Sequence, residues 1–213
     1  MPPQIVEKKL PREFYLRDTR EVARDLLGKE LVRLSPEGTA TGIIVETEAY
    51  LGIDDRASHA YGGRASRRIA IMYEEGGRAY IYLIYGMYWC LNLTTRERGV
   101  PEAVLIRAVE PVTGIDLMRQ RRGTSGKRPA DLAGGPGKLC QALAIDGSLY
   151  GEDLGGDTLY VREGIAVPPE QISTSPRVNI DFAGEAADQE WRYFIKENIK
   201  RDIKGSGPTL MFL

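Results

Sequence analysis

Residues 79–95, AYIYLIYGMYWCLNLTT, form a run of aromatic and β-branched residues that glycine interrupts at position 86. Such residues favour extended strands, and a glycine inside the run favours a bend. Residues 41–51 and 103–110 predict further strands, and the connections between strands are mostly too short for crossover helices. We therefore expect an α+β fold with a curved, largely antiparallel β-sheet core, flanked by helices and carrying a protruding β-hairpin.

The remaining elements are predicted from periodicity and turn residues. The turn at 35–38, with its Pro and Gly, joins two strands. Strands are expected at 31–34, 41–51, 103–110, 158–162 and 193–195. Helices are expected at 13–28, 114–122 and 138–145, with a loop rich in Gly, Arg and Pro at 122–137.

The composition is that of an ordinary globular protein. The chain has 213 residues, of which 42% are hydrophobic and 28% charged, which argues against disorder and against a fibrous protein. No compositional break divides it, so we expect one domain over 1–213. No run of about 18 apolar residues could cross a bilayer, and the N-terminal segment lacks the apolar core of a signal peptide. We therefore expect a cytoplasmic protein, at the nucleoid if the source is prokaryotic.

The net charge of −1 hides an unequal distribution of charge along the chain. Residues 56–128 contain 13 Lys and Arg against 6 Asp and Glu, whereas residues 129–190 contain 3 against 11. Affinity for nucleic acid follows the cations at the contact and not the total charge. The sequence leaves open whether the basic part binds phosphates or is a solvated, internally paired surface.

Two carboxylates share one face of the strand IIVETEAYLG (43–52). Alternation along a strand places Ile44, Glu46, Glu48 and Tyr50 on the same side, with about 7 Å between the Cα atoms of alternate residues. That separation suits an acid and a base that flank a reacting sugar carbon. The alternative is an exposed edge strand with solvated glutamates.

A metal site is the weaker interpretation of the same region. His59, the only histidine, follows Asp54 and Asp55, but the spacing fits no standard metal motif. The cysteines, Cys90 and Cys140, are far apart in apolar surroundings, which predicts buried small hydrophobic residues. We expect no metal and no cofactor.

The tyrosines of the 79–95 run are unusually dense, because positions 80, 82, 85 and 88 are all tyrosine. A buried tyrosine hydroxyl needs a hydrogen-bond partner, so core strands more often use Val, Ile and Phe. Aromatic rings beside a basic region are suited to stacking on nucleobases. An aromatic packing layer within the core is the competing interpretation.

Two glycine-containing stretches are candidates for contacts with phosphate. Residues 134–138, GGPGK, lack the glycine spacing and the Ser or Thr of a P-loop and predict a loop that opens a helix. Its backbone N–H groups and Lys138 could hold one phosphate. Residues 62–64, GGR, with Arg67 and Arg68, form a basic turn.

Several motifs in order resemble those of one family. IVETEAYLG is followed by a histidine, GGR, YIYLIYGMYWCLN, VLIRAVEP, GPGKLCQAL and RVNIDFAGE. Together they resemble the alkyladenine (3-methyladenine) DNA glycosylases of the mammalian type, over residues 10–196. The resemblance implies hydrolysis of the N-glycosidic bond of alkylated or deaminated purines in duplex DNA during base excision repair. It also implies a monofunctional enzyme that leaves an abasic site and acts as a monomer, without a membrane or an obligate protein partner.

The resemblance assigns three residues to catalysis. Glu48 corresponds to the general base that activates the attacking water, and Arg107 and the main-chain carbonyl of Val178 help to position this water. One carboxylate can deprotonate water and also stabilise an oxocarbenium-like sugar. Glu46 is then either an orienting residue or a structural ion-pair partner.

The resemblance also implies a pocket for an extruded base. Tyr50, His59 and Tyr82 would sandwich the base, and the backbone at Ala57 and His59 would read its edge. Asn92 would discourage guanine by a clash with the exocyclic amine. A purine alkylated at N3 or N7 carries positive charge, so the tyrosine rings would attract it by a cation–π interaction.

The remaining implied roles are contacts with DNA. Tyr85 would enter the minor groove and fill the gap left by the extruded nucleotide, because a wedge keeps a flipped base out of the stack. Arg64, Ser66, Arg68 and Lys138 would contact the backbone. Residues 66–69 read Ser-Arg-Arg-Ile where the family usually reads Thr-Pro-Arg-Asn.

Two other functions fit parts of the sequence. A non-catalytic binder of damaged or single-stranded nucleic acid would keep the aromatic residues and basic loops, but it has no need of a carboxylate in the pocket. A metal-dependent hydrolase would use Glu46, Glu48 and His59, and EDTA would abolish its activity.

Overall fold

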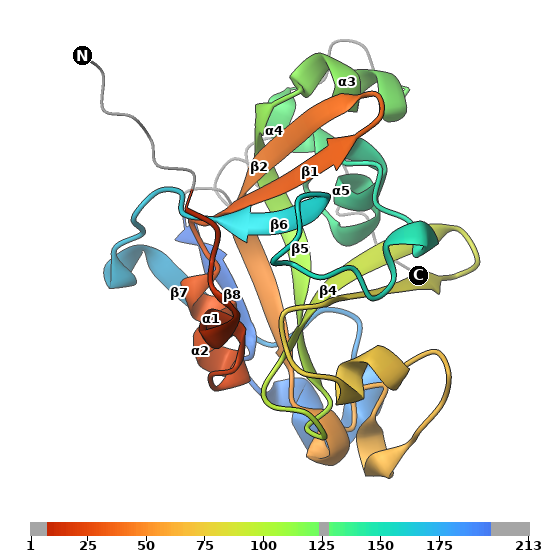
Figure 1. The fold of residues 1–213 in the computed structure, drawn as a ribbon. Helices are drawn as coiled ribbons and strands as arrows, with labels where there is room; N and C mark the ends of the chain where they lie inside the picture. The colour runs from red at the N-terminus through yellow and green to blue at the C-terminus, as the bar shows by residue number, and fades with distance from the viewer. Residues whose placement is uncertain (1–7, 124–127, 197–213) are drawn as a thin grey trace.

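Strand β2 organises the sheet in the computed structural model, which describes residues 8–123 and 128–196 (Figure 1). The order of the strands is β3-β4-β5-β2-β1-β6, and β8 pairs with both β2 and β7. Every strand pairing is antiparallel. The strands are β1 (Glu30–Ser35), β2 (Gly38–Tyr50), β3 (Ala79–Ile84), β4 (Tyr88–Thr95), β5 (Glu102–Thr113), β6 (Leu159–Arg162), β7 (Ile172–Ser175) and β8 (Arg192–Ile195).

Short helices flank this curled sheet, which confirms the α+β prediction. The α-helices are α1 (Arg12–Tyr15), α2 (Thr19–Asp25), α3 (Ile115–Arg121), α4 (Pro129–Leu132) and α5 (Pro136–Ala142). The 3₁₀ segments are η1 (Gly52–Asp54), η2 (Tyr61–Gly63), η3 (Ala70–Tyr73), η4 (Gly147–Leu149), η5 (Pro169–Gln171) and η6 (Asp181–Asp188). No helix among the described residues is both long and apolar enough to span a membrane.

The protruding hairpin is formed by β3 and β4, as the glycine at position 86 predicts. Tyr85 (φ 53°) and Gly86 (φ 69°) are both left-handed, and Met87 N–H donates to the carbonyl of Ile84 at 3.2 Å. Consecutive left-handed residues match the right-handed twist of paired strands. The turn therefore places Tyr85 at the tip of the hairpin.

One helix prediction is wrong in detail. The helix expected at 13–28 consists of α1 and α2, because Asp18 caps the second helix by accepting from the N–H of Arg20 at 2.9 Å. An N-cap residue has non-helical geometry and therefore ends any preceding helix. Pro136 at the first position of α5 likewise begins that helix two residues earlier than expected.

Several strand bounds also differ from the predictions. β5 continues past the expected end at 110, because Pro111 lies opposite Gly42 at a β-bulge, where a missing N–H is tolerated. β7 was not predicted. It is a short strand that pairs with β8 alone.

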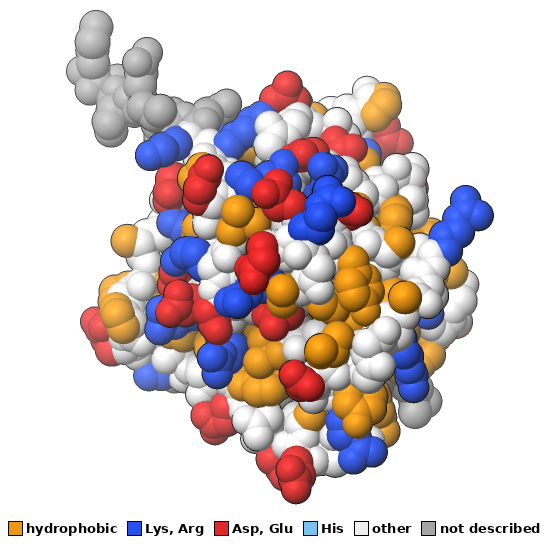
Figure 2. Space-filling view, turned by 60° about the horizontal axis from the view of Figure 1, so that its bottom comes forward, with side chains coloured by type: hydrophobic (Ala, Val, Ile, Leu, Met, Phe, Trp, Pro, Cys, Tyr) orange, Lys and Arg blue, Asp and Glu red, His pale blue; other side chains and the backbone are white. Residues whose placement is uncertain are grey.

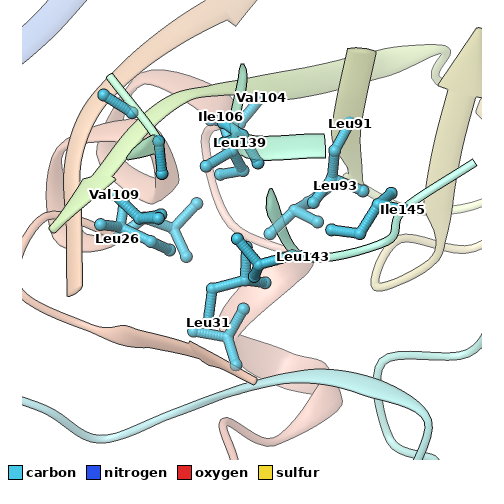
Figure 3. Close-up of a cluster of buried hydrophobic side chains, with 14 of the residues drawn as sticks. Leu26, Leu31, Leu91, Leu93, Val104, Ile106, Val109, Leu139, Leu143 and Ile145 are labelled. Carbon is cyan, nitrogen blue, oxygen red and sulfur yellow. The ribbon is translucent and has the colours of Figure 1, made fainter. Parts of the chain in front are cut away.

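The main core lies between the sheet and the helices. One cluster of buried side chains contains Leu26, directly after α2, Leu31 of β1, Leu91 of β4, Leu139 of α5 and Leu143 (Figure 3). Cys90 and Cys140 are free and buried, as predicted. Burial of such side chains contributes about 1.5–3 kcal/mol each relative to exposure.

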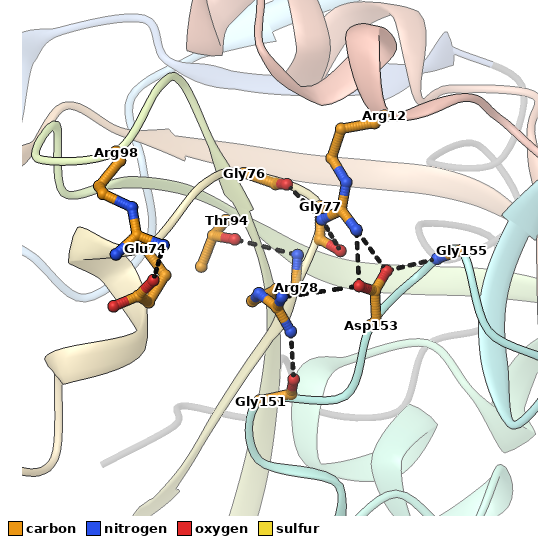
Figure 4. Close-up of polar contacts among 10 residues, drawn as sticks. All are labelled: Arg12, Glu74, Gly76, Gly77, Arg78, Thr94, Arg98, Gly151, Asp153 and Gly155. Atoms are coloured by element: carbon orange, nitrogen blue, oxygen red, sulfur yellow. Dashed lines mark hydrogen bonds and ion pairs between the residues drawn. The ribbon is translucent and has the colours of Figure 1, made fainter.

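A polar cluster fixes the entrance to β3 (Figure 4). Both terminal nitrogens of the Arg12 guanidinium are used: Nη1 donates to the carbonyl of Gly76 at 2.7 Å, and Nη2 to Asp153 at 2.6 Å. Arg78 lies 3.7 Å from the same aspartate. The first helix is thereby tied to the start of the hairpin and to the 150–156 segment.

Candidate active site

A cavity of about 450 Å³ opens beside the β3–β4 hairpin. Residues from β2, β3, β4 and β5 line it, together with the 57–59 and 178–182 segments. Of the residues given a predicted role in the site, it is lined by Tyr50, Ala57, His59, Arg68, Tyr82, Tyr85, Asn92, Arg107 and Val178. Figure 2, turned so that the bottom of Figure 1 comes forward, shows hydrophobic side chains gathered among charged ones on the face that it brings to the front.

Glu48 lies directly behind this lining and is fully buried. Its Oε1 atom accepts from the main-chain N–H of Val178 at 2.8 Å and lies 3.3 Å from Nη1 of Arg107. Its Oε2 atom accepts from the hydroxyl of Tyr50 at 2.9 Å. An ionised carboxylate offers about four acceptor positions, so three neighbours leave one position for a water.

The predicted shared face holds for Glu46, Glu48 and Tyr50, but not for Ile44. Glu46 and Glu48 both contact Arg107, and Tyr50 contacts Glu48. Val45 has no partner on β5, and this bulge changes which side the residues before it face, so that Ile44 is buried in the main core. A second irregularity falls at Arg107 itself, opposite Glu46 and Thr47. These two irregularities set the side of the sheet on which Glu46, Glu48 and Arg107 lie.

Glu46 forms ion pairs with two arginines. Its Oε1 atom accepts from Nε of Arg107 at 2.7 Å and from Nε of Arg192 at 2.6 Å. Burial alone would raise the pKa of Glu46, but the two guanidinium groups outweigh it and hold this pKa below its usual value. Burial disfavours the charged form of Arg107 too, yet Glu48 and Glu46 raise its pKa overall. Arg107 therefore stays charged between the two carboxylates.

The aromatic wall of the cavity carries no charge at neutral pH. Burial, with the nearby charge of Arg68, lowers the pKa of His59 to about 4. Burial and then Glu48 raise the pKa of Tyr50, while burial and Cys90 raise that of Tyr82. Tyr50 hence keeps its proton, and its hydroxyl donates a hydrogen bond to Glu48.

His59 and Tyr82 form one unit of this wall. Their ring centroids are 4.6 Å apart at an interplanar angle of 76°, which is an edge-to-face contact. Nδ1 of His59 is 2.7 Å from the hydroxyl of Tyr80. No flat ring fits between His59 and Tyr82, so an incoming base would stack on the pair from the side of the cavity.

The other predicted pocket residues are also placed by hydrogen bonds. Ala57 N–H donates to Oδ1 of Asp55 at 3.0 Å, which leaves the carbonyl of Ala57 for the predicted contact with a base. Asn92 is buried, and its amide donates to the carbonyl of Tyr80 at 3.2 Å. The N–H of Val178 contacts Glu48, while the role of its carbonyl stays a prediction.

The residues predicted to contact the DNA backbone lie outside the cavity lining, apart from Arg68. Arg64 and Ser66 are exposed in the loop between η2 and η3, and Lys138 is half-buried in α5. The guanidinium carbon of Arg68 lies 5.2 Å from the centroid of the Tyr82 ring. Ile69, where the family usually has Asn, is buried in a small cluster with Met72 and Tyr80.

Glu46, Glu48 and His59 do not come together as a metal site in the described part of the chain. Among residues 8–123 and 128–196, no three His, Cys, Asp or Glu side chains form a group that could hold a metal ion. Asp55 is instead bound to Arg177, and His59 contacts Tyr80.

An ion pair that the sequence did not predict joins the two walls of the cavity. Nη1 and Nη2 of Arg177 donate to the two carboxylate oxygens of Asp55 at 2.6 and 2.8 Å, and both side chains are completely buried. The Arg177 guanidinium also lies 4.7 Å from the centroid of the Tyr50 ring. Asp55 precedes Ala57 and His59, and Arg177 precedes Val178, so this pair fixes both segments together.

The fold and the cavity define a site in which aromatic side chains lie beside a buried carboxylate. A family model described as Methylpurine-DNA glycosylase (MPG) matches residues 13–199. The chain therefore belongs to the methylpurine-DNA glycosylase family. It is a DNA-repair hydrolase that acts on N-glycosyl bonds.

Curated relatives support the same assignment. A protein of Desulfitobacterium hafniense (strain Y51) named "Putative 3-methyladenine DNA glycosylase" is 48% identical over 203 residues, which cover 92% of this chain and 100% of the relative. A protein of the same name from Methanocella arvoryzae is 50% identical over 190 residues, covering 89% and 93%. Another, from Bacillus velezensis, is 47% identical over 191 residues, covering 90% and 95%.

Proposed function

We propose that this chain is a monofunctional 3-methyladenine DNA glycosylase that also accepts deaminated purines. It extrudes the damaged nucleotide from duplex DNA, hydrolyses the N-glycosidic bond with a water activated by Glu48, and leaves an abasic site. The observation that carries the proposal is the buried Glu48 carboxylate, held by Val178, Arg107 and Tyr50 directly behind an aromatic cavity. We further expect the enzyme to act as a cytoplasmic monomer.

The reaction needs an extruded base because a carboxylate cannot reach the sugar carbon of a nucleotide stacked in a duplex. Tyr85 at the hairpin tip fills the vacated space, and the base enters the cavity against Tyr50 and the His59–Tyr82 pair. Uncharged, electron-rich rings attract a purine that alkylation has made cationic.

The chemical step requires one base and no covalent intermediate. The N-glycosidic bond breaks, and its electron pair neutralises the alkylated purine, which leaves as the free base. A deaminated purine such as hypoxanthine is not cationic, so it leaves as an anion and takes up a proton from solvent to become the free base. Water adds to C1′ of the oxocarbenium-like sugar and gives a proton to Glu48, so that a hydroxyl remains on the abasic site. Arg107 and the carbonyl of Val178 orient this water. Since no lysine forms a Schiff base with the sugar, the strand is not cut.

The test is release of free base, in EDTA, from a duplex containing 3-methyladenine and from one containing hypoxanthine. Glu48→Gln should lower the release rate by about 10²–10⁴-fold and keep DNA binding, because Gln cannot accept the proton of water. Glu30→Gln is the matched control: Glu30 is buried and paired at 2.9 Å with Arg162, which does not line the cavity, whereas the partners of Glu48 do. It should release base at the wild-type rate.

Each alternative has its own outcome. Tight binding without release by the wild type, both with and without EDTA, would indicate a non-catalytic binder. Equal release by wild type and Glu48→Gln would mean that the water is activated elsewhere. Release that EDTA abolishes would indicate a metal-dependent hydrolase.

A further inference from the structure

Phe182 is the most exposed large hydrophobic side chain among the described residues, with 73% of its surface accessible. It belongs to η6 and lines the same cavity as Val178 and Tyr85. A phenyl ring that is largely solvated at a cavity lacks, in the free protein, most of the favourable free energy of burial. A ligand that covers the ring would recover it.

The exposure of Phe182 is imposed by the turn that carries it. Ile180 and Ala183, on either side, are buried, and Ala183 N–H donates to the carbonyl of Ile180 at 2.8 Å. Gly184 follows with φ 60° and ψ −133°, a conformation that is essentially restricted to glycine. Between these anchors, Asp181 and Phe182 are both exposed.

The position of Phe182 relative to Glu48 indicates what covers it. Val178, which donates to Glu48, lies four residues earlier on the same wall of the cavity. If Glu48 activates the attacking water, C1′ of the extruded nucleotide has to lie beside this wall, with the base directed towards Tyr50 and Tyr82. The deoxyribose then occupies the space between Glu48 and the mouth.

We propose that the Phe182 ring packs against the deoxyribose of the extruded nucleotide and thereby helps to hold the flipped state. This inference rests on the proposed function. The carbon face of a deoxyribose is the apolar part of the DNA backbone and matches a phenyl ring. Asp181 and Glu185, exposed on either side, would repel phosphates, so the contact at this point is with the sugar.

The experiment measures the affinity of Phe182→Ala for three duplexes, with Glu48→Gln present in both the test and the reference protein so that no base is released. One duplex carries hypoxanthine, one carries tetrahydrofuran, a sugar analogue without a base, and one is unmodified. Affinity for the first two should fall about tenfold, because part of a phenyl side chain is no longer buried. The loss should not change with salt concentration, since no counterions are involved.

The controls separate this contact from the general effects of substitution. Ile165→Ala removes another exposed hydrophobic side chain, 57% accessible and outside the cavity lining, and should leave all three affinities unchanged. Phe182→Tyr keeps the ring and should bind like the reference protein. Base release by the wild-type enzyme, which keeps Glu48, is measured in parallel and tests the proposed function separately.

Equal losses with hypoxanthine and tetrahydrofuran duplexes would support the contact with the sugar. Unchanged affinity for both duplexes would overturn it. A loss confined to the hypoxanthine duplex would also overturn it, because the ring would then touch the base. A loss of the same size on unmodified DNA would assign Phe182 to general DNA binding instead.

Discussion

The floor of the cavity and the tip of the β3–β4 hairpin are built in opposite ways. At the floor, Glu48 is completely buried and bound by groups from β2, β5 and the 178 segment. At the tip, Tyr85 is 54% exposed, and only a local turn holds its backbone. The floor therefore depends on contacts between distant segments, whereas the tip depends on a few consecutive residues.

This difference separates two tasks of the proposed reaction. A buried polar group has to be paired, because an unpaired one costs about 1–3 kcal/mol and a charge costs more. The floor is thus already organised before DNA arrives. The tip and Phe182 expose apolar surface that only a partner can cover. We expect substitutions at the floor to act on stability and on the chemical step, and substitutions at the tip to act on DNA binding.

The largest effect on stability is expected at the Arg177–Asp55 pair. Arg177→Met should lower the free energy of unfolding by about 3–5 kcal/mol, because it leaves the carboxylate of Asp55 buried without its partner. The measurement is urea denaturation, in which the midpoint should fall while the slope stays unchanged.

An exposed ion pair provides the control for this prediction. Arg98 and Glu74 are 2.7 Å apart near the start of β3, and Arg98 is 73% exposed (Figure 4). Arg98→Met should cost less than about 1 kcal/mol, because water already solvates both groups. Similar costs for Arg98→Met and Arg177→Met would contradict the view that pairing at the floor is what stabilises it.

His59, on the aromatic wall, should give a smaller effect that depends on pH. Its pKa is lowered from 6.5 to about 4 in the folded protein, so folding favours the neutral ring. The contribution of the buried, neutral His59 ring to the free energy of unfolding is fully present above pH 6.5. It is lost progressively as pH falls from 6.5 towards 4, because the unfolded chain then binds a proton at this histidine and the folded protein does not. The loss should reach up to about 3 kcal/mol.

His59→Gln tests this contribution, because glutamine keeps a polar side chain but does not titrate in this range. Between pH 7 and pH 4, the free energy of unfolding of the wild type should fall by up to about 3 kcal/mol more than that of His59→Gln. Comparing the two proteins removes the carboxylates that titrate in the same range. A difference that stays constant with pH would show that burial does not disfavour the charged ring.

Local patterns in the sequence were enough to predict the strands and the tip. The aromatic run and the glycine at position 86 predicted β3, β4 and the bend between them, because turn chemistry is encoded within a few residues. The break at Asp18 was missed, since a capping residue inside an amphipathic pattern can equally be read as part of one helix. β7 was missed because its four residues, ISTS, contain only one apolar side chain.

The site was predictable where it lies on one strand. Alternation placed Glu46, Glu48 and Tyr50 together, and the resemblance supplied the residues that line the cavity with them. The Arg177–Asp55 pair could not be predicted, because 122 residues separate its members and no local pattern connects them. The bulge at Val45 was missed for a related reason: it depends on the register with β5, which appears only in the assembled sheet.

The smallest expected effects concern Tyr85 at the tip, and two substitutions there separate its backbone from its ring. Tyr85 has φ 53°, a conformation that costs a bulky residue about 1 kcal/mol or more and costs glycine little. Tyr85→Gly should therefore raise the free energy of unfolding by about 1 kcal/mol relative to Tyr85→Ala, which keeps a Cβ atom. Both variants should bind lesion-containing duplex about tenfold less tightly than wild type, because each lacks the ring that fills the gap. Stability is measured by urea denaturation and affinity with a tetrahydrofuran duplex. Equal stability of the two variants would exclude backbone strain at the tip, and wild-type affinity in either would show that the exposed ring does not contact DNA. A variant that is more stable and binds more weakly is expected only where the exposed residue serves a partner, since at the floor both properties depend on the same buried contacts.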